Sequence, residues 1–242
     1  MKKNLFLICL LFLSVILLKK VAFCENYNVY SPYNCSSSAF NPDERIEFVV
    51  DFSNSMTEKI NGERKIDIAI STLEKILKQI PRNSYIGFRA YGHRAGITYF
   101  DSCKVSALIN PVEQNNAHVI QASMYQLSPH GVTPITFSLK RAVSKDFAGY
   151  LGKKRIILLT DGGENCDESP CDFALKLIQE RDDFRIDVIA LDLYDKEALE
   201  QLKCTALATS GKFYTANTAA ELLKSFQDTL NFEKDVQGVV IP

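Results

Sequence analysis

The sequence predicts an α/β protein of one domain, with a central sheet that is covered by helices on both faces. From residue 46 onward, short hydrophobic runs alternate with segments in which apolar residues recur every three or four positions. This alternation is typical of strands and amphipathic helices that follow one another along the chain. Several runs are almost entirely aliphatic, as expected of parallel strands buried on both sides. With 46% hydrophobic residues, the chain can also form a sizeable core.

Residues 1–24 have the pattern of an export leader. A pair of lysines precedes an apolar stretch over 5–18, which is shorter than a helix needs to cross a bilayer. We therefore expect a signal peptide and export to the periplasm or the extracellular space. Two more lysines at 19–20 are unusual in a cleaved leader, so an uncleaved N-terminal membrane anchor is the alternative.

Residues 25–44 are rich in Tyr, Asn, Ser and Pro and show no apolar period, which indicates a polar N-terminal extension. The domain itself is expected over 45–231, followed by a C-terminal tail over 232–242. Its first strand is the aliphatic run 46–50. Its first helix is 66–80, whose apolar stripe stops before a proline.

The later elements follow from the same two patterns. The mixed runs 85–91 and 105–109 are expected to pair as a hairpin at one edge of the sheet. The aliphatic runs 156–159 and 186–191 are expected in its middle. The remaining elements are a short last strand at 212–215 and helices at 115–127, 135–147, 171–178, 198–208 and 219–230.

The overall charge limits the classes of partner. A formal net charge of -1 gives no general attraction to nucleic acid or to acidic membrane surfaces. We expect neither as the main partner, and membrane contact only through an uncleaved leader or anchor. The chain also lacks a phosphate-binding glycine loop and a G-x-S-x-G motif, which argues against the chemistry that those motifs support.

Oxygen-bearing side chains follow two of the central strands and precede one helix. In an open α/β sheet the ligand site lies beyond the carboxyl ends of the strands. Asp51, Ser53 and Ser55 come directly after the first strand, and Asp161 comes directly after another central strand. Thr133 lies on a loop just before a helix. We therefore expect these side chains to meet at one edge of the sheet.

The five side chains supply two carboxylates and three hydroxyls. Hard oxygen donors of this kind suit Mg²⁺, with Mn²⁺ or Ca²⁺ as alternatives, rather than zinc or copper. Because only two of the donors are anionic, a bound ion would remain a strong Lewis acid that an Asp or Glu of a partner could bind. Each motif alone has an ordinary structural explanation, such as a helix cap or a strand-ending turn. Their placement on one sheet favours the metal site.

The order of these residues resembles a known family. Asp51-Phe52-Ser53-Asn54-Ser55 is similar to the D-x-S-x-S motif of von Willebrand factor A and integrin I domains. The resemblance covers about residues 45–231, and the stretches 91–94, 161–171 and 201–211 look similar to a bacterial exported subgroup. It implies a single doubly wound, mostly parallel six-stranded sheet with one antiparallel edge strand and helices on both faces. It also implies a metal-ion-dependent adhesion site formed by Asp51, Ser53, Ser55, Thr133 and Asp161, with Asp161 often acting through water.

The cysteines indicate possible disulfide bridges. Two of the seven fall within the leader, and export would place the other five where disulfides persist, so at least one has no partner within the chain. The family resemblance implies that Cys171 and Cys204 lie near the tops of adjacent helices, which leaves Cys103 and Cys166 as a second bridge. Cys166 with Cys171 is the local alternative, and unpaired buried thiols are another.

Three functions are compatible with these residues. We expect no catalysis but a module that grips an acidic residue of a protein or surface partner through its metal ion. One alternative is a Mg²⁺-dependent phosphotransferase with Asp51 as nucleophile. The D-x-D motif of such enzymes is interrupted here by Ser53, which removes the general acid. The other alternative is a purely structural envelope module, in which the metal only holds the loops together.

Overall fold

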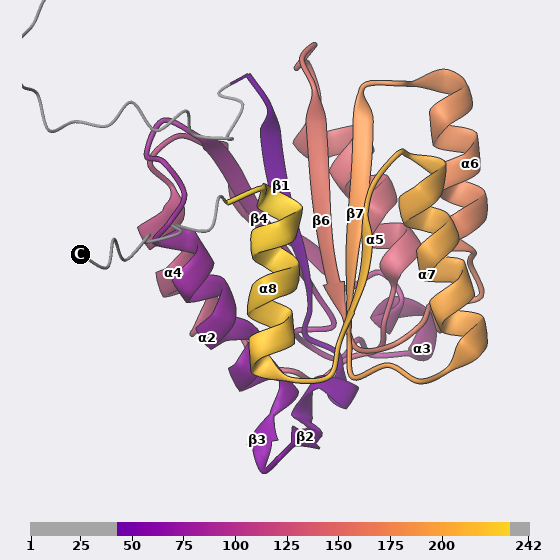
Figure 1. The fold of residues 1–242 in the computed structure, drawn as a ribbon. Helices are drawn as coiled ribbons and strands as arrows, with labels where there is room; N and C mark the ends of the chain where they lie inside the picture. The colour runs from indigo at the N-terminus through magenta and orange to yellow at the C-terminus, as the bar shows by residue number, and fades with distance from the viewer. Residues whose placement is uncertain (1–42, 233–242) are drawn as a thin grey trace, which may run out of the picture. The chain divides into compact units, whose positions relative to one another are not determined.

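The computed structural model describes residues 43–232, which fold around one six-stranded sheet (Figure 1). Its strands lie in the order β5-β4-β1-β6-β7-β8, and all neighbours are parallel except β4 and β5. The strands are β1 Arg45–Asp51, β4 Tyr85–Tyr91, β5 Ser106–Glu113, β6 Lys154–Thr160, β7 Phe184–Leu191 and β8 Phe213–Ala216. The expected α/β class, with one antiparallel edge strand, is confirmed.

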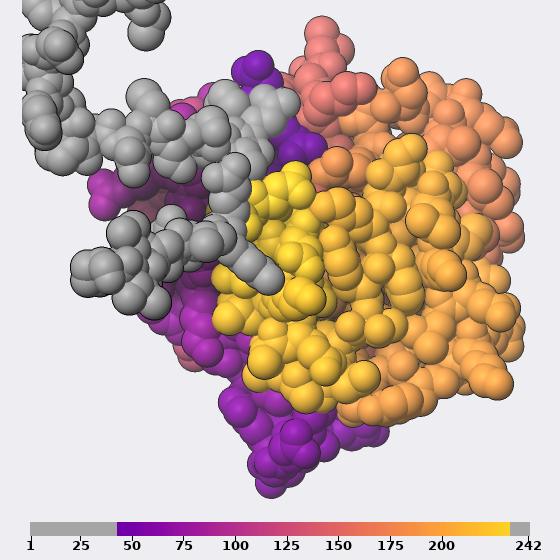
Figure 2. Space-filling model, viewed as in Figure 1, coloured from indigo at the N-terminus to yellow at the C-terminus, as the bar shows by residue number. Residues whose placement is uncertain are grey.

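Helices cover both faces of the sheet. On one face pack α2 Lys65–Leu77, α4 Ala117–Met124 and α8 Ala219–Leu230, and on the other α5 Ile135–Arg141, α6 Pro170–Glu180 and α7 Lys196–Ala208. Figure 1 and Figure 2 view the molecule from the β8 edge of the sheet, with α8 (yellow) on one side of that edge and α7 (orange) on the other. In β1, Phe48 and Val50 pack towards α2 and α8, whereas Val49 packs towards α5. A strand buried on both faces needs apolar residues at consecutive positions, as the sequence has them.

Several short elements are absent from the sequence prediction. β2 Lys59–Ile60 and β3 Glu63–Arg64 form a hairpin whose turn residues Asn61 and Gly62 have φ values of 52° and 93°. Asn-Gly favours this two-residue turn, but strands of two residues are too short to show an alternating pattern. Two short helical segments are also missed: the 3₁₀ turn Asn54–Thr57 and the four-residue helix α3 Tyr99–Ser102, which Thr98 caps.

Several element ends differ from the prediction, among them those of β5, α2 and α5. β5 continues to Glu113 rather than to 109, because an edge strand need not be apolar throughout and its pairing is irregular here. α2 ends at Leu77, and the buried Ile80 follows in the next turn rather than in the helix. α5 ends at Arg141 and continues as a π-helical turn, Ala142–Asp146.

Two disulfide bridges join the loops and helices near the carboxyl ends of the strands. Cys103 is bonded to Cys166, and Cys171 is bonded to Cys204. These are the two pairs that the family resemblance implied, and the local pairing of Cys166 with Cys171 is not formed. The first bridge links the end of α3 to the loop after β6, and the second links α6 to α7.

We expect non-reducing peptide mapping to recover the same two bridges from the purified protein. Replacing both Cys171 and Cys204 by Ser should lower the free energy of unfolding by about 3–4 kcal/mol, because the bridge closes a loop with a sequence separation of 33. Chemical denaturation of the variant and the wild type measures the difference. A recovered peptide that joins Cys166 to Cys171 would contradict this connectivity.

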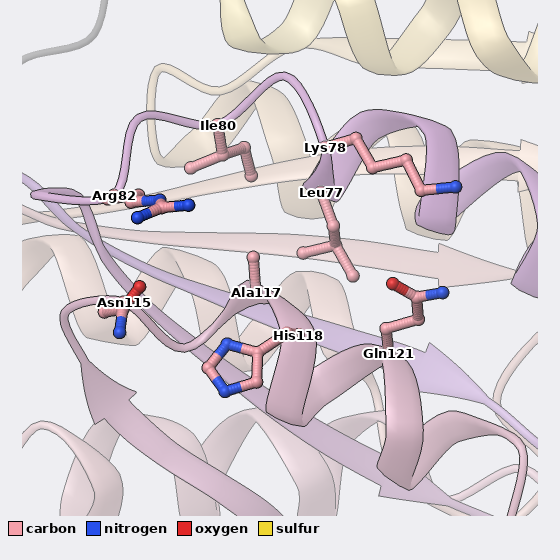
Figure 3. A pocket seen from close by; sticks show the side chains of 8 residues that line it. All are labelled: Leu77, Lys78, Ile80, Arg82, Asn115, Ala117, His118 and Gln121. Atoms are coloured by element: carbon pink, nitrogen blue, oxygen red, sulfur yellow. The ribbon is translucent and has the colours of Figure 1, made fainter.

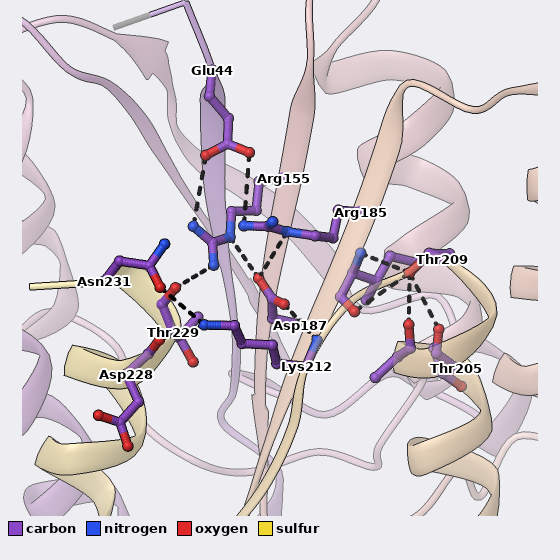
Figure 4. Close-up of polar contacts among 12 residues, drawn as sticks. Glu44, Arg155, Arg185, Asp187, Thr205, Thr209, Lys212, Asp228, Thr229 and Asn231 are labelled. Atoms are coloured by element: carbon purple, nitrogen blue, oxygen red, sulfur yellow. Dashed lines mark hydrogen bonds and ion pairs between the residues drawn. The ribbon is translucent and has the colours of Figure 1, made fainter. Parts of the chain in front are cut away.

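Charged side chains are buried between β6, β7 and the end of α8 (Figure 4). Arg155 and Asp187 are 3% and 0% exposed, and Arg155 Nε donates to Asp187 Oδ2 at 2.5 Å. Asp187 Oδ1 accepts from the backbone N–H of Lys212 at 2.7 Å, and Arg155 also donates to the carbonyl of Thr229. The pair therefore ties two central strands to the start of β8 and to the last turn of α8.

Within residues 43–232, no helix is long and apolar enough to cross a membrane. The leader or anchor expected at 1–24 lies outside the residues that the structure describes, as do nearly all of the extension at 25–44 and all but the first residue of the tail at 232–242.

Candidate metal centre

Asp51 is the last residue of β1, which lies between β4 and β6 in the sheet. The side chain is fully buried. Its Oδ1 accepts a hydrogen bond from the backbone N–H of Ser53, and its Oδ2 accepts one from the hydroxyl of Thr160, both at 2.7 Å. Because Thr160 ends β6, these two bonds hold the carboxylate between the tips of the two central strands.

Ser53 and Ser55 lie on the turn that follows β1. Their hydroxyl oxygens are 3.0 Å apart, and the hydroxyl of Ser55 donates to Asp161 Oδ1 at 2.7 Å. Asp161 comes directly after β6 and is buried. The structure thus brings four of the five predicted residues together from two segments that are more than a hundred positions apart.

Thr133 approaches the same place from the loop before α5. A parallel bridge between Ser53 and Gly131 joins this loop to the serine turn. Thr133 is buried, and its hydroxyl oxygen lies 4.0 Å from the point that a Cβ on Gly162 would occupy. Since Gly162 follows Asp161 in the chain, the fifth predicted residue borders the other four.

Gly92, which follows β4, lets three loops approach one another. It has a φ of +68°, and a Cβ at this position would lie 2.7 Å from the backbone nitrogen of Ser53 and 2.8 Å from the carbonyl oxygen of Val132. The carbonyl oxygen of Gly92 accepts hydrogen bonds from the N–H groups of His130 and Gly131. A side chain here would therefore push the serine turn away from the Thr133 loop.

Gly92→Ala is expected to weaken Mg²⁺ binding by at least about tenfold and to destabilise the fold by about 2 kcal/mol or more. A left-handed backbone alone costs a residue with a Cβ about 1–2 kcal/mol, and the contact with Ser53 adds to this. Gly149→Ala is the matched control, because Gly149 has a φ of +79° but no atom within 4 Å of an added Cβ. Calorimetric titration with Mg²⁺ and thermal melts compare the two. Equal effects on Mg²⁺ binding would contradict the role of Gly92.

The two aspartates are held in an environment that disfavours their charged forms. Burial raises the pKa of Asp51 to about 7, and the nearby charge of Asp161 adds to this effect. Burial also raises the pKa of Asp161, although a hydrogen bond from Ser55 and the charge of Lys65 act in the opposite direction. A cation bound between such carboxylates would offset both the repulsion and the loss of hydration.

The donor set fits a hard divalent cation. In the described part of the chain no three His, Cys, Asp or Glu side chains gather as a metal-binding group, so an ion here would have two acidic donors and otherwise hydroxyls. Oxygen donors of this type suit Mg²⁺, Mn²⁺ or Ca²⁺.

Lys65, the first residue of α2, is a neighbour of the centre that the sequence motifs do not reveal. Its side chain is 5% exposed, and its Nζ lies 3.1 Å from Asp161 Oδ2, 2.9 Å from Glu58 Oε2 and 3.5 Å from Asp192 Oδ2. One sequence signal was available: Lys65 precedes the buried Ala69 by four residues and so lies on the apolar face of its helix. A lysine on that face needs buried partners.

A cavity of about 420 Å³ lies away from the candidate metal centre, near the opposite end of the sheet and beside the loop that precedes β4 (Figure 3). Leu77, Ile80 and Ala117 form its apolar wall, and Arg82 and His118 are among its polar residues. None of its lining side chains is a carboxylate, so the cavity is unsuited to a metal cation. It is separate from the centre at the tips of β1 and β6.

The chain is similar to known proteins in sequence and in fold. Residues 46–164, which include all five predicted metal residues, match the family model of the von Willebrand factor type A domain. The uncharacterized protein YwmD of Bacillus subtilis (strain 168) is 29% identical over 191 residues, which cover 76% of this chain and 84% of that protein.

Solved structures with lower sequence identity have the same fold. Proximal thread matrix protein 1 from the mussel byssus, with a zinc-occupied MIDAS motif, matches with a TM-score of 0.58 and 20% identity over 77% of this chain. The match covers only 44% of that protein. The vWF domain of the type V pili tip protein Mfa5 from Porphyromonas gingivalis matches with a TM-score of 0.57 and 15% identity, covering 78% of this chain and 94% of that one.

Proposed function

The chain belongs to the von Willebrand factor type A domain family, and on this premise we propose that it is a binding module that holds its partner through a divalent metal ion. The observation that carries the proposal is the convergence of Asp51, Ser53, Ser55 and Asp161 through contacts of 2.7–3.0 Å. The position of Thr133 beside Gly162 adds a fifth oxygen donor. The zinc in the MIDAS motif of the mussel byssus protein supports a divalent ion at this motif.

Each residue has a specific part in the proposed centre. Asp51, Ser53 and Ser55 would hold the ion, Thr133 would join them when a partner is bound, and Asp161 would act through water. We favour Mg²⁺, with Mn²⁺ or Ca²⁺ as alternatives, because the donors are all oxygen atoms. The ion would supply an electrophile for a carboxylate oxygen, since the hydroxyl donors do not neutralise it.

The partner in this proposal is a protein or a surface polymer that presents an Asp or Glu. The site lies in the loops at the carboxyl ends of the strands, where a partner can approach, and Ser55 is partly exposed there. The matching pilus tip domain supports a role at a cell surface. Export by the leader at 1–24 would bring the domain over 45–231 to such a partner, with 25–44 as an extension in front of it.

Two peptide libraries test the proposal, one with a fixed Glu in every peptide and one with Gln at the same position. We expect the immobilised protein to retain peptides of the Glu library in Mg²⁺, to release them in EDTA, and to retain no Gln peptides. The comparison isolates the carboxylate, because Glu and Gln have nearly the same shape. Retention that is indifferent to EDTA, or equal for the two libraries, would contradict metal-mediated binding.

The enzyme alternative makes a different prediction. If Asp51 were a nucleophile beside Mg²⁺, the protein would hydrolyse an aryl phosphate, and the variant Asp51→Asn would lose that activity. We expect the wild type and Asp51→Asn to show the same background rate with p-nitrophenyl phosphate. A Mg²⁺-dependent rate that disappears in the variant would instead establish catalysis.

A further inference from the structure

We propose that Lys65 is a working part of the metal centre: its ammonium group neutralises Asp161, which weakens the hold on the metal and strengthens the pull on a partner's carboxylate. The inference rests on the proposed metal binding. It concerns a residue outside the D-x-S-x-S turn, the Thr133 loop and the segment after β6.

The contacts of Asp161 carry the proposal. Its Oδ2 lies 3.1 Å from Lys65 Nζ, and its Oδ1 accepts the hydroxyl of Ser55 at 2.7 Å. Both oxygens therefore already have a partner, and one of these partners is a full positive charge. Asp161 is thus held in place by the side chains of α2 and of the serine turn, which suits a residue that acts on the ion through water.

Lys65 is fixed in this position by its surroundings. Its side chain is 5% exposed, and two further carboxylates face its ammonium group, Glu58 from the turn before β2 and Asp192 from the end of β7. A buried ammonium group is stable only when it is paired and hydrogen-bonded. The three contacts come from three different loops, so the charge of Lys65 stays at the edge of the metal centre.

The charge of Lys65 has two opposite consequences. It repels a cation held by Asp51 and the serines, so it weakens metal binding. It attracts an incoming carboxylate, so it strengthens partner binding. Charges a few Å apart in a buried site interact strongly, because water screens them little. A lysine that served only to tie α2 to the neighbouring loops would not produce effects of opposite sign. Its removal would loosen the centre, and metal binding and partner binding would both become weaker.

The experiment compares three variants with the wild type. Lys65→Gln removes the charge and keeps a hydrogen-bond donor towards Asp161, whereas Lys65→Arg keeps the charge. Lys59→Gln is the control for overall charge, because Lys59 lies exposed on β2. Calorimetry measures Mg²⁺ affinity, and water-proton relaxation follows acetate added to the Mn²⁺-loaded protein. Circular dichroism confirms that each variant is folded.

Lys65→Gln should bind Mg²⁺ at least about tenfold more tightly and acetate at least about threefold more weakly than the wild type. Lys65→Arg and Lys59→Gln should stay within about threefold of the wild type in both measurements. Unchanged or weaker Mg²⁺ binding by folded Lys65→Gln would overturn the proposal. Failure of the wild type to bind any divalent metal would instead overturn the proposed function itself. The experiment therefore distinguishes failure of the Lys65 proposal from failure of the proposed function.

A second variant keeps the test decisive if Lys65→Gln does not fold. Glu58 has a side chain that is 66% exposed, so Glu58→Gln should fold normally. It leaves more of the charge of Lys65 unopposed beside Asp161 and should weaken Mg²⁺ binding by about two- to fivefold. Glu63→Gln, at an exposed position on β3, is the control for the same charge change. Equal Mg²⁺ affinity in Glu58→Gln and Glu63→Gln would contradict the role of Lys65.

Discussion

Asp51→Asn is expected to lower Mg²⁺ affinity by more than about a hundredfold while the protein stays folded. The change removes one of only two anionic donors, and hard cations bind carboxylates far better than amides. The amide oxygen can still accept the hydrogen bond from the N–H of Ser53, so the turn is kept. Calorimetric titration with Mg²⁺ measures the loss, and thermal melts report the fold.

The direction in which Asp51→Asn changes the stability of the metal-free protein can also be predicted. Folding raises the pKa of Asp51 to about 7 from an ordinary value of 3.8, so ionisation of this group favours the unfolded chain. The free energy of unfolding therefore falls as the pH rises between those two values. A neutral asparagine avoids this loss of stability. Without metal, Asp51→Asn should therefore melt at the same temperature as the wild type or higher at pH 7.

The neighbouring position supplies the control. Asn54 is exposed and lies between the two serines of the turn, so Asn54→Ala should leave Mg²⁺ affinity and melting temperature almost unchanged. Unaltered Mg²⁺ binding by Asp51→Asn would remove Asp51 from the centre. Unfolding of the same variant would instead favour the structural alternative, in which the site only holds the loops together.

Asp187→Ala is expected to lower the free energy of unfolding by about 3–5 kcal/mol, because it leaves the buried guanidinium of Arg155 without its closest carboxylate. The backbone N–H of Lys212 loses its acceptor as well. The remaining carboxylate, Glu44, is 3.6 Å from Arg155 and only partly replaces the lost pair. Urea denaturation at pH 7 measures the loss.

An exposed ion pair provides the comparison for this prediction. Glu168 pairs with Lys140, and their side chains are 36% and 48% exposed, so Glu168→Ala should cost less than about 1 kcal/mol. Combining Asp187→Leu with Arg155→Met should recover part of the loss, because no unpaired charge stays buried. A cost for Asp187→Ala as small as that for Glu168→Ala would show that the buried pair contributes little.

The α/β class and the meeting of the five oxygen-bearing side chains at one edge of the sheet could be predicted because the strands that position them show local sequence patterns. An aliphatic run such as 46–50 identifies a central strand, and the residues that follow it must lie at its carboxyl end. Parallel strands place those ends at one edge, so the sequence alone predicts that Asp51 and Asp161 approach each other.

The features that the sequence did not predict depend on packing between distant segments. The sequence around Lys65 does not predict that this first residue of α2 contacts Asp161 and Asp192. The length of β5 is set by its pairing with β4, not by its own partly polar sequence. The disulfide pairing also required the fold, because several pairings of Cys103, Cys166, Cys171 and Cys204 are compatible with the sequence.

Isothermal titration of the folded, metal-free protein with Mg²⁺ tests the metal centre most directly. A centre built from Asp51, Ser53, Ser55, Thr133 and Asp161 predicts saturable uptake of about one ion per chain, which Asp51→Asn abolishes. The absence of uptake with Mg²⁺, Mn²⁺ and Ca²⁺, or the same uptake by Asp51→Asn, would contradict it.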